Sequence, residues 1–332
     1  MRHLLTCAFV ALVAAAQAAL PTSGLSNTEY PVVIHLSVED AAKTKVGKIF
    51  LAEAEKKESE PEGRKTVEKL GIRTRDLRDI TVLIKPGQNG EAIVVGMARG
   101  TFDKARIESF ATLAGVTSKT FSGLKGWDAN QLTAATSGAK APESAAAGDS
   151  AYLIVVDNTT LLFASDEAAL ADAAATLKAN KPWNNPGLTA ALSSVTHGWI
   201  GLSADVLAVE SEEAKENPEA KPSGAKTATL ALGENATDLQ VRVAATFVSE
   251  AKATEGISQL KGLLGFAQIG LMPSADDTPE QAKQKGDTLA LVQRLKVEQK
   301  GANGSISLDY PSDKAGEFVA KQIAEAVSTA GR

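Results

Sequence analysis

Residues able to transfer protons or bind metals are few in this chain. Histidine occurs three times, and only His35 and His197 lie beyond the first 18 residues. His35 stands in an apolar run between Ile34 and Leu36, and His197 precedes Gly198-Trp199. These positions favour partly buried imidazoles satisfied by a backbone group over a base or a metal ligand. With a single cysteine and no spaced pair of histidines, the sequence has too few ligands for a zinc site.

Nucleophilic and phosphate-binding motifs do not occur either. The run Gly201-Leu202-Ser203-Ala204-Asp205 lacks the second glycine that a nucleophile elbow needs. Neither a GxxxxGK[ST] loop nor a GxGxxG run after a strand is present. We therefore assign no catalytic, cofactor-binding or metal-binding residue, expect no cofactor, and do not expect an enzyme.

Paired carboxylates and tryptophans have structural explanations. Glu39-Asp40 and Asp276-Asp277 are adjacent in sequence, and such neighbours usually point to different sides of the chain. Helix caps and loops account for both pairs, so a glycosidase-type site is not favoured. Trp127, Trp183 and Trp199 are isolated from one another, which is typical of tryptophans that pack in a core or between domains.

The N-terminal segment 1–18 has the pattern of a signal peptide. Arg2 and His3 are followed by the apolar run Leu4 to Val13, and Ala16-Gln17-Ala18 has the small residues of a cleavage site. Cys7 lies too early in the apolar run for a lipid-bearing cysteine, and cleavage after Ala18 would remove it. We therefore expect an exported protein, periplasmic or extracellular, that folds without disulfides.

Charge and the length of apolar runs limit the kinds of partner that the protein can have. The formal charge is −5 and basic residues are not clustered in sequence, which argues against a nucleic-acid partner. The most apolar later segment, Leu260 to Met272, is broken by three glycines and followed by Pro273. A membrane-spanning helix needs about 20 apolar residues. No stable membrane span is expected once the signal peptide is removed.

Strand and turn patterns predict an α+β fold. Apolar, β-branched runs flank turn-rich segments. Polar residues alternate with Leu239, Val241 and Val243, which is typical of antiparallel strands with one solvent-exposed face. The predicted hairpins are Ile80 to Lys85 with Ala92 to Arg99, Ala151 to Val156 with Thr160 to Ala164, Ala228 to Leu232 with Leu239 to Phe247, and Leu295 to Lys300 with Ser305 to Tyr310.

Matched landmarks suggest an internal repeat. Phe102 and Phe247 are 145 residues apart, and Asp166 and Asp313 are 147 apart. Ser165-Asp166 and Ser312-Asp313 are predicted to cap helices. We therefore expect two similar lobes, 28–180 and 186–331, each made of antiparallel hairpins with helices packed on one face.

A resemblance follows from three runs: Gly96-Met97-Ala98-Arg99-Gly100-Thr101-Phe102-Asp103, then Thr120-Phe121-Ser122-Gly123-Leu124, then Leu161 to Leu170 with its Ser165-Asp166-Glu167-Ala168 helix start. They resemble exported bacterial α+β proteins of unassigned function, whose strand-helix units end in a hairpin and an S-x-E-A-L-type helix start. The resemblance implies an extracytoplasmic α+β protein and no catalytic residue.

Three functions remain open. The first is a non-enzymatic binding or scaffolding protein that uses a broad sheet surface and has an unknown protein partner. The second is a carrier of an apolar ligand, with Leu260 to Met272 lining a cavity between sheet and helices. The third is a hydrolase that uses carboxylates alone.

Overall fold

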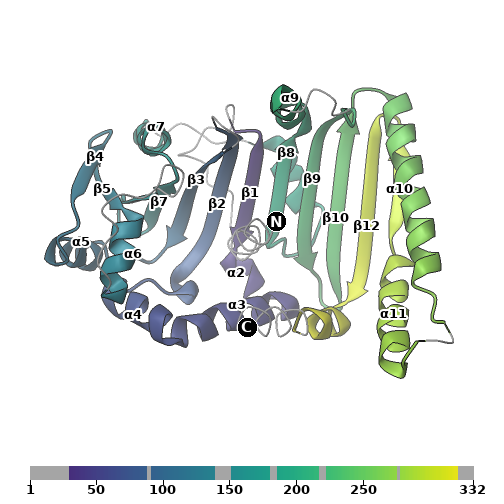
Figure 1. Ribbon diagram of the computed structural model, residues 1–332, viewed down its shortest axis with the longest axis horizontal. Coiled ribbons are helices and arrows are strands. Elements are labelled where there is room, and N and C mark those ends of the chain that lie inside the picture. The colour runs from purple at the N-terminus through teal and green to yellow at the C-terminus, as the bar shows by residue number, and fades with distance from the viewer. Residues whose placement is uncertain are drawn as a thin grey trace.

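One antiparallel sheet of 12 strands organises the molecule, and its order is β11-β12-β10-β9-β8-β1-β2-β3-β7-β6-β5-β4 (Figure 1). The computed structural model describes residues 30–87, 91–138, 151–179, 185–216, 222–274 and 277–320. The strands are β1 (Val32–Ser37), β2 (Leu77–Pro86), β3 (Ala92–Gly100), β4 (Ser118–Phe121), β5 (Leu124–Asp128), β6 (Tyr152–Val155), β7 (Thr160–Ala164), β8 (Ile200–Asp205), β9 (Ala225–Glu234), β10 (Asp238–Phe247), β11 (Lys296–Lys300) and β12 (Asn303–Pro311).

The predicted hairpins are confirmed. β2 pairs with β3, β6 with β7, β9 with β10 and β11 with β12, each antiparallel. Their sequences alternate apolar and polar residues and are interrupted by glycine-, asparagine- and aspartate-containing turns, which fixes both the faces and the reversals. Together with the helices they make a mixed α+β fold, as the sequence predicted.

Helices lie on both faces of this sheet rather than on the one face expected. The helices are α2 (Val38–Ala41), α3 (Lys45–Ser59), α4 (Pro61–Leu70), α5 (Lys104–Leu113), α6 (Ala129–Ser137), α7 (Glu167–Lys178), α8 (Pro186–Ser193), α9 (Val206–Glu216), α10 (Glu250–Gly270) and α11 (Pro279–Val292), with a 3-10 turn at Thr74–Asp76. Residues 312–320 are also helical.

Two apolar layers explain this arrangement. On the α8 face, Val33, Leu83 and Leu162 pack against α7 and α8. On the opposite α3 face, one cluster joins Leu36 and Ile200 to α2 and α3, and another joins strand residues to α4, α5 and α6. Successive side chains of a strand point to opposite faces of the sheet. Since helices cover both faces of the central strands, these strands are nearly continuous in apolar residues.

The two predicted lobes meet at β1 and β8, which pair antiparallel in the middle of the sheet. His35 lies opposite Gly201, with Ile34 opposite Leu202 and Leu36 opposite Ile200. A side chain at Gly201 would collide with Leu188 and Leu192 of α8, the nearest atom being 2.5 Å away. The lobes thus share one sheet, while their boundaries and the duplication itself stay predictions.

Helix capping was predicted correctly at one of two positions. Asp166 caps α7, its Oδ1 accepting from the amide of Ala169 at 2.8 Å, while Ser165 Oγ accepts from the amide of Val94. In the C-terminal helix Ser312 is already helical and buried, and its Oγ has no hydrogen-bond partner in the described part of the chain. Asp313 forms an ion pair with Lys45. The cap predicted there was wrong because the strand β12 runs directly into the helix.

A distant carboxylate completes the start of α3. Glu234, at the end of β9, is 2% exposed, and its two oxygens accept from the amides of Lys45 and Val46 at 3.0 and 2.9 Å. Thr44 Oγ1 accepts from the amide of Gly47. The first three amides of α3, which no helical carbonyl can satisfy, are therefore all bonded, and this ties the two predicted lobes together.

Candidate functional site

His35 is buried in the central strand β1. Its Nδ1 lies 2.8 Å from Thr81 Oγ1 on β2, and its Nε2 has no hydrogen-bond partner among the residues that the structure describes. Burial, and secondly the charge of Arg99, lower the pKa of His35 to about 3. The imidazole is therefore neutral at pH 7. The ring is fully buried and bonded to a side-chain hydroxyl, whereas the sequence predicted a partly buried ring satisfied by a backbone group.

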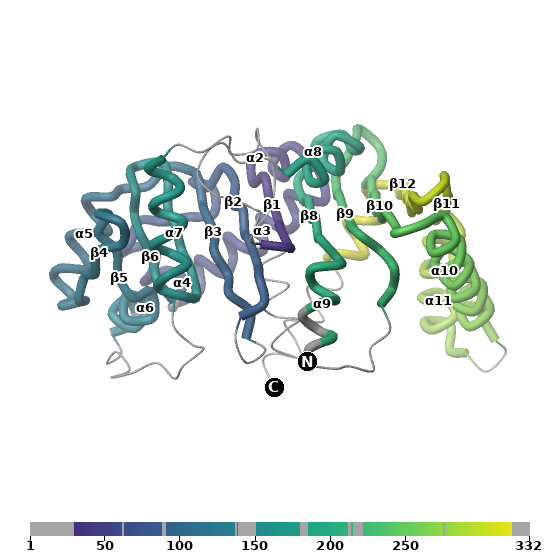
Figure 2. Tube along the Cα trace, turned by 90° about the horizontal axis from the view of Figure 1, so that it is seen from above, coloured from purple at the N-terminus to yellow at the C-terminus, as the bar shows by residue number. Residues whose placement is uncertain are grey.

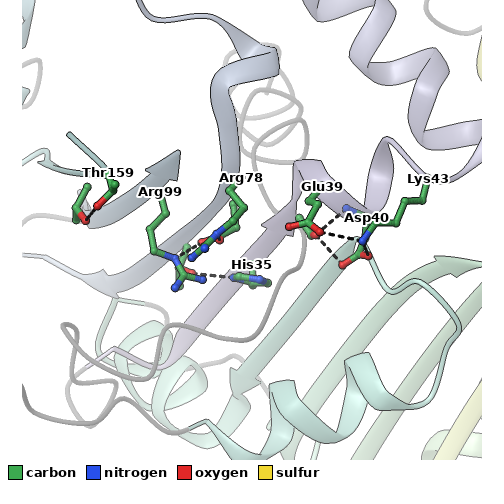
Figure 3. A network of polar contacts seen from close by, with 11 residues as sticks. His35, Glu39, Asp40, Lys43, Arg78, Arg99 and Thr159 are labelled. Atoms are coloured by element: carbon green, nitrogen blue, oxygen red, sulfur yellow. Dashed lines mark hydrogen bonds and ion pairs between the residues drawn. The ribbon is translucent and has the colours of Figure 1, made fainter. Parts of the chain in front are cut away.

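A buried ion cluster lies on the same face of the sheet. Asp79 is fully buried, and its carboxylate accepts from Arg99 Nε at 2.7 Å and from Arg78 Nε at 3.1 Å. Figure 3 shows Arg78 and Arg99 close to His35. A buried carboxylate needs such partners, because an unpaired charge inside a protein is costly. The cluster stabilises the centre of the sheet and leaves His35 beside a net positive charge.

The carboxylate pair Glu39-Asp40 is committed to Lys43. Lys43 Nζ lies 3.0 Å from Glu39 Oε1 and 2.9 Å from Asp40 Oδ1 (Figure 3). These bonds to Asp40 and Glu39 raise the pKa of Lys43. In a glycosidase the two acids face each other across a sugar. Here they share one ammonium group on a short helix, so that reading finds no support.

Ser37, Asp40 and His197 approach one another without forming a catalytic triad. Ser37 Oγ donates to Asp40 Oδ2 at 2.8 Å and caps α2, while His197 Nδ1 lies 3.9 Å from Asp40 Oδ1. In a triad the histidine stands between the serine and the acid. Here the acid stands between them, so the hydroxyl donates to the carboxylate and the histidine is not its partner.

Other residues considered in the sequence are explained by packing or loop contacts. Trp127 and Trp199 are buried, 1% and 3% exposed, as expected. Asp277 accepts from Lys285 Nζ at 2.7 Å, and this bond lowers its pKa. Trp183, Asp276 and the signal-peptide segment lie outside the described residues. Within the part of the chain that the structure describes, no three His, Cys, Asp or Glu side chains gather as a metal site.

The apolar segment Leu260 to Met272 covers the second half of α10 and the two residues after it, at one end of the sheet beside α11 (Figure 2). We expected it to line a cavity. Instead Leu263, Phe266, Ile269 and Met272 are 67, 77, 66 and 57% exposed. That expectation was wrong because the sheet ends at β11, and this end of the helix has nothing to cover it among the described residues.

The first half of α10 holds the helix in place. Ser249 caps it by accepting from the amide of Lys252. Ala253 and Ile257 are buried, and a side chain at Gly304 of β12 would meet Ile257 at 2.7 Å. The close approach of helix to strand therefore depends on that glycine. Beyond Ile257 no residue of α10 is fully buried, so the helix runs on past its packing site.

This exposed surface is the strongest candidate for a functional site, and we name Leu263, Phe266, Ile269 and Met272 the α10 patch. From Gly262 to Met272 the chain carries no charge, and Gln268 is its one polar side chain. A helix that is apolar all round is normally buried. A sequence signal existed: positions 253, 257, 260 and 264 form one helical stripe, which leaves 263, 266 and 269 on another side.

Within the described residues, no helix combines the length and apolar character needed to cross a bilayer. Comparison with protein-family models gave no match, and comparison with curated proteins gave none either. The chain is similar to solved structures of TP0453. Crystal form III has a TM-score of 0.48 at 7% identity, covering 92% of this chain and all of the other. Crystal form I has a TM-score of 0.45 at 8% identity.

Proposed function

We propose that this is a non-enzymatic binding or scaffolding protein that acts outside the cytoplasm and docks a protein partner through the α10 patch. The observation that carries the proposal is the exposure of four large apolar side chains on one uncharged helix end. Exposed apolar patches of this kind mark interaction surfaces in soluble proteins. The signal-peptide pattern supports the location.

The charges of α10 favour a protein partner over a lipid surface. Helices that lie in a membrane interface have a polar face rich in Lys and Arg. α10 instead carries two acids, Glu250 and Glu255, and two bases, Lys252 and Lys261, all before Gly262. Such a helix has no net attraction to anionic lipids. Its uncharged end suits a helix-in-groove contact, with Phe266 as an aromatic anchor.

The carrier reading loses its main support. It placed Leu260 to Met272 around an enclosed ligand, whereas the patch side chains point into solvent. Holding an apolar ligand away from water requires burial of most of its surface. An open helix side does not provide this, although it can contribute half of a protein interface.

Site-specific photo-crosslinking tests the proposal. A photoreactive phenylalanine analogue is placed at Phe266, and in a control at Thr227, an exposed position on β9. Both proteins are irradiated in the cells that produce them, and adducts are identified by mass spectrometry. We expect one defined protein adduct at position 266 and none at position 227. Equal labelling at both positions, or adducts at 266 with lipid alone, would contradict the proposal.

A further inference from the structure

A second surface, near the central strands β1 and β2 of the sheet, has the chemistry of a small-molecule site. Between α2, α3 and the start of β2, a cavity of about 280 Å³ is lined by Val38, Leu51 and Leu77 among others. A neighbouring hollow of about 350 Å³ lies between α3, α4 and the segment before β2. Glu55 and Arg75 line both, and we name the two together the arginine groove.

Three arginines reach this groove from six consecutive residues. Arg73, Arg75 and Arg78 line it, although the chain as a whole carries a formal charge of −5. Arg78 uses its Nε on Asp79. The guanidinium groups of Arg73 and Arg75 make no hydrogen bond or ion pair with any residue that the structure describes. Two guanidinium groups with free donors next to one hollow form a ready oxyanion site, because their forked N–H groups match carboxylate and phosphate oxygens.

The backbone that carries these arginines is fixed. Glu58 of α3 accepts from both the amide and the hydroxyl of Thr74, which lies between them. These bonds hold the segment against α3 and at the same time occupy the Glu58 carboxylate, which lines the groove. Glu39, the other acid of the cavity wall, is paired with Lys43. Glu55 alone is left uncommitted among the carboxylates of the groove, against two free arginines.

The remaining lining is apolar. Val38, Leu51 and Leu77 lie on the cavity side of the groove, and Val67 lies on the other. A ligand that reaches from the arginines into the cavity would therefore place an oxyanion on Arg73 and Arg75 and an apolar body against the aliphatic side chains. Protein pockets commonly hold small ligands in this way, with few polar groups fixing the orientation.

We propose that the arginine groove binds a small molecule that carries one oxyanion, a carboxylate or a phosphate, on a short apolar body. The volumes of about 280 and 350 Å³ restrict the body to roughly the size of one aromatic ring or a short chain. The site is independent of the α10 patch, because the groove lies by the central strands β1 and β2 whereas α10 lies at the β11 end of the sheet (Figure 2), so either proposal can fail without the other.

Titration calorimetry with four probes tests this site: benzoate, phenyl phosphate, inorganic phosphate and the uncharged benzyl alcohol. We expect saturable binding of benzoate or phenyl phosphate, and whichever is tighter distinguishes a carboxylate from a phosphate ligand. Inorganic phosphate should bind at least tenfold more weakly than the better aromatic anion, and benzyl alcohol should not bind saturably. Added salt should weaken the binding, because the exposed charges are screened.

Variants locate the site. The double change Arg73→Gln with Arg75→Gln should weaken binding at least tenfold, and the corresponding lysine variants should lie between it and the wild type, because lysine keeps the charge but not the fork. Arg294→Gln, in the other predicted lobe, is the matched control and should bind normally. Both arginines are exposed, so the unfolding midpoint should not change. Absence of saturable binding of either aromatic anion, or unchanged binding in the double variant, would overturn the proposal.

Discussion

Acid should destabilise this protein in part through one buried histidine. The pKa of His35 is lowered to about 3 in the folded state, chiefly by burial, from an ordinary value of 6.5. Between those values the unfolded chain binds a proton that the folded chain does not. The stability is therefore unaffected by His35 above pH 6.5 and falls as the pH drops from 6.5 towards 3.

The size of the effect follows from the pKa difference. Each pH unit inside the window costs about 1.4 kcal/mol, so lowering the pH from 7 to 4 should remove about 3 kcal/mol through His35. A domain is stable by only about 5–15 kcal/mol in total. One buried imidazole thus has a measurable share in the acid sensitivity of the fold.

Urea unfolding followed by tryptophan fluorescence measures this contribution, because Trp127 and Trp199 are buried. Titrating carboxylates affect wild type and variant alike. The comparison therefore uses the slope of the unfolding free energy against pH, and how it differs between the two proteins. His35→Gln should be less stable at pH 7 but lose about 3 kcal/mol less between pH 7 and pH 4. His197→Gln, at a half-exposed position, should keep the wild-type slope. Equal slopes for wild type and His35→Gln would refute the reasoning.

Three further predictions concern packing and caps. Glu234→Ala should cost about 2–4 kcal/mol, since it leaves a buried and a partly buried amide of α3 unsatisfied, whereas Glu234→Gln should cost less; urea unfolding distinguishes them. Asp166→Ala should cost about 1 kcal/mol through the lost cap, and Asp172→Ala on the exposed side of α7 should cost almost nothing, as thermal unfolding can show. Gly96→Ala should cost about 1–3 kcal/mol because its Cβ would lie 1.9 Å from Phe163. By contrast, Gly262→Ala, with nothing within 4 Å, should stabilise α10 slightly in the same assay.

The features predictable from sequence are the local ones. The hairpin β9–β10 follows from alternating apolar residues on either side of a Gly- and Asn-containing turn. The start of α11 follows from Thr278 and Pro279, where the structure has a full capping box with Gln281. In both cases the residues that determine the structure lie within a few positions of each other.

The features that were missed depend on residues far apart in the chain. The pairing of His35 with Gly201, and the bonds from Glu234 to the start of α3 across 189 residues, have no local signal. For the α10 patch, the helical spacing separates positions 263, 266 and 269 from the packed stripe, but it does not show whether another element covers them. An apolar run has the same sequence pattern whether another element packs on it or not. Phe266 faces solvent because the sheet ends at β11.

The central claim is that the α10 patch binds a protein partner. Native mass spectrometry of the protein purified from its own cells tests it most directly, when wild type is compared with the double variant Leu263→Glu, Phe266→Glu. Both side chains are exposed, so the variant should fold with an unchanged unfolding midpoint. We expect the wild type to carry a bound protein of defined mass and the variant to be free of it. The same bound mass on both proteins, or none on either, would contradict the account.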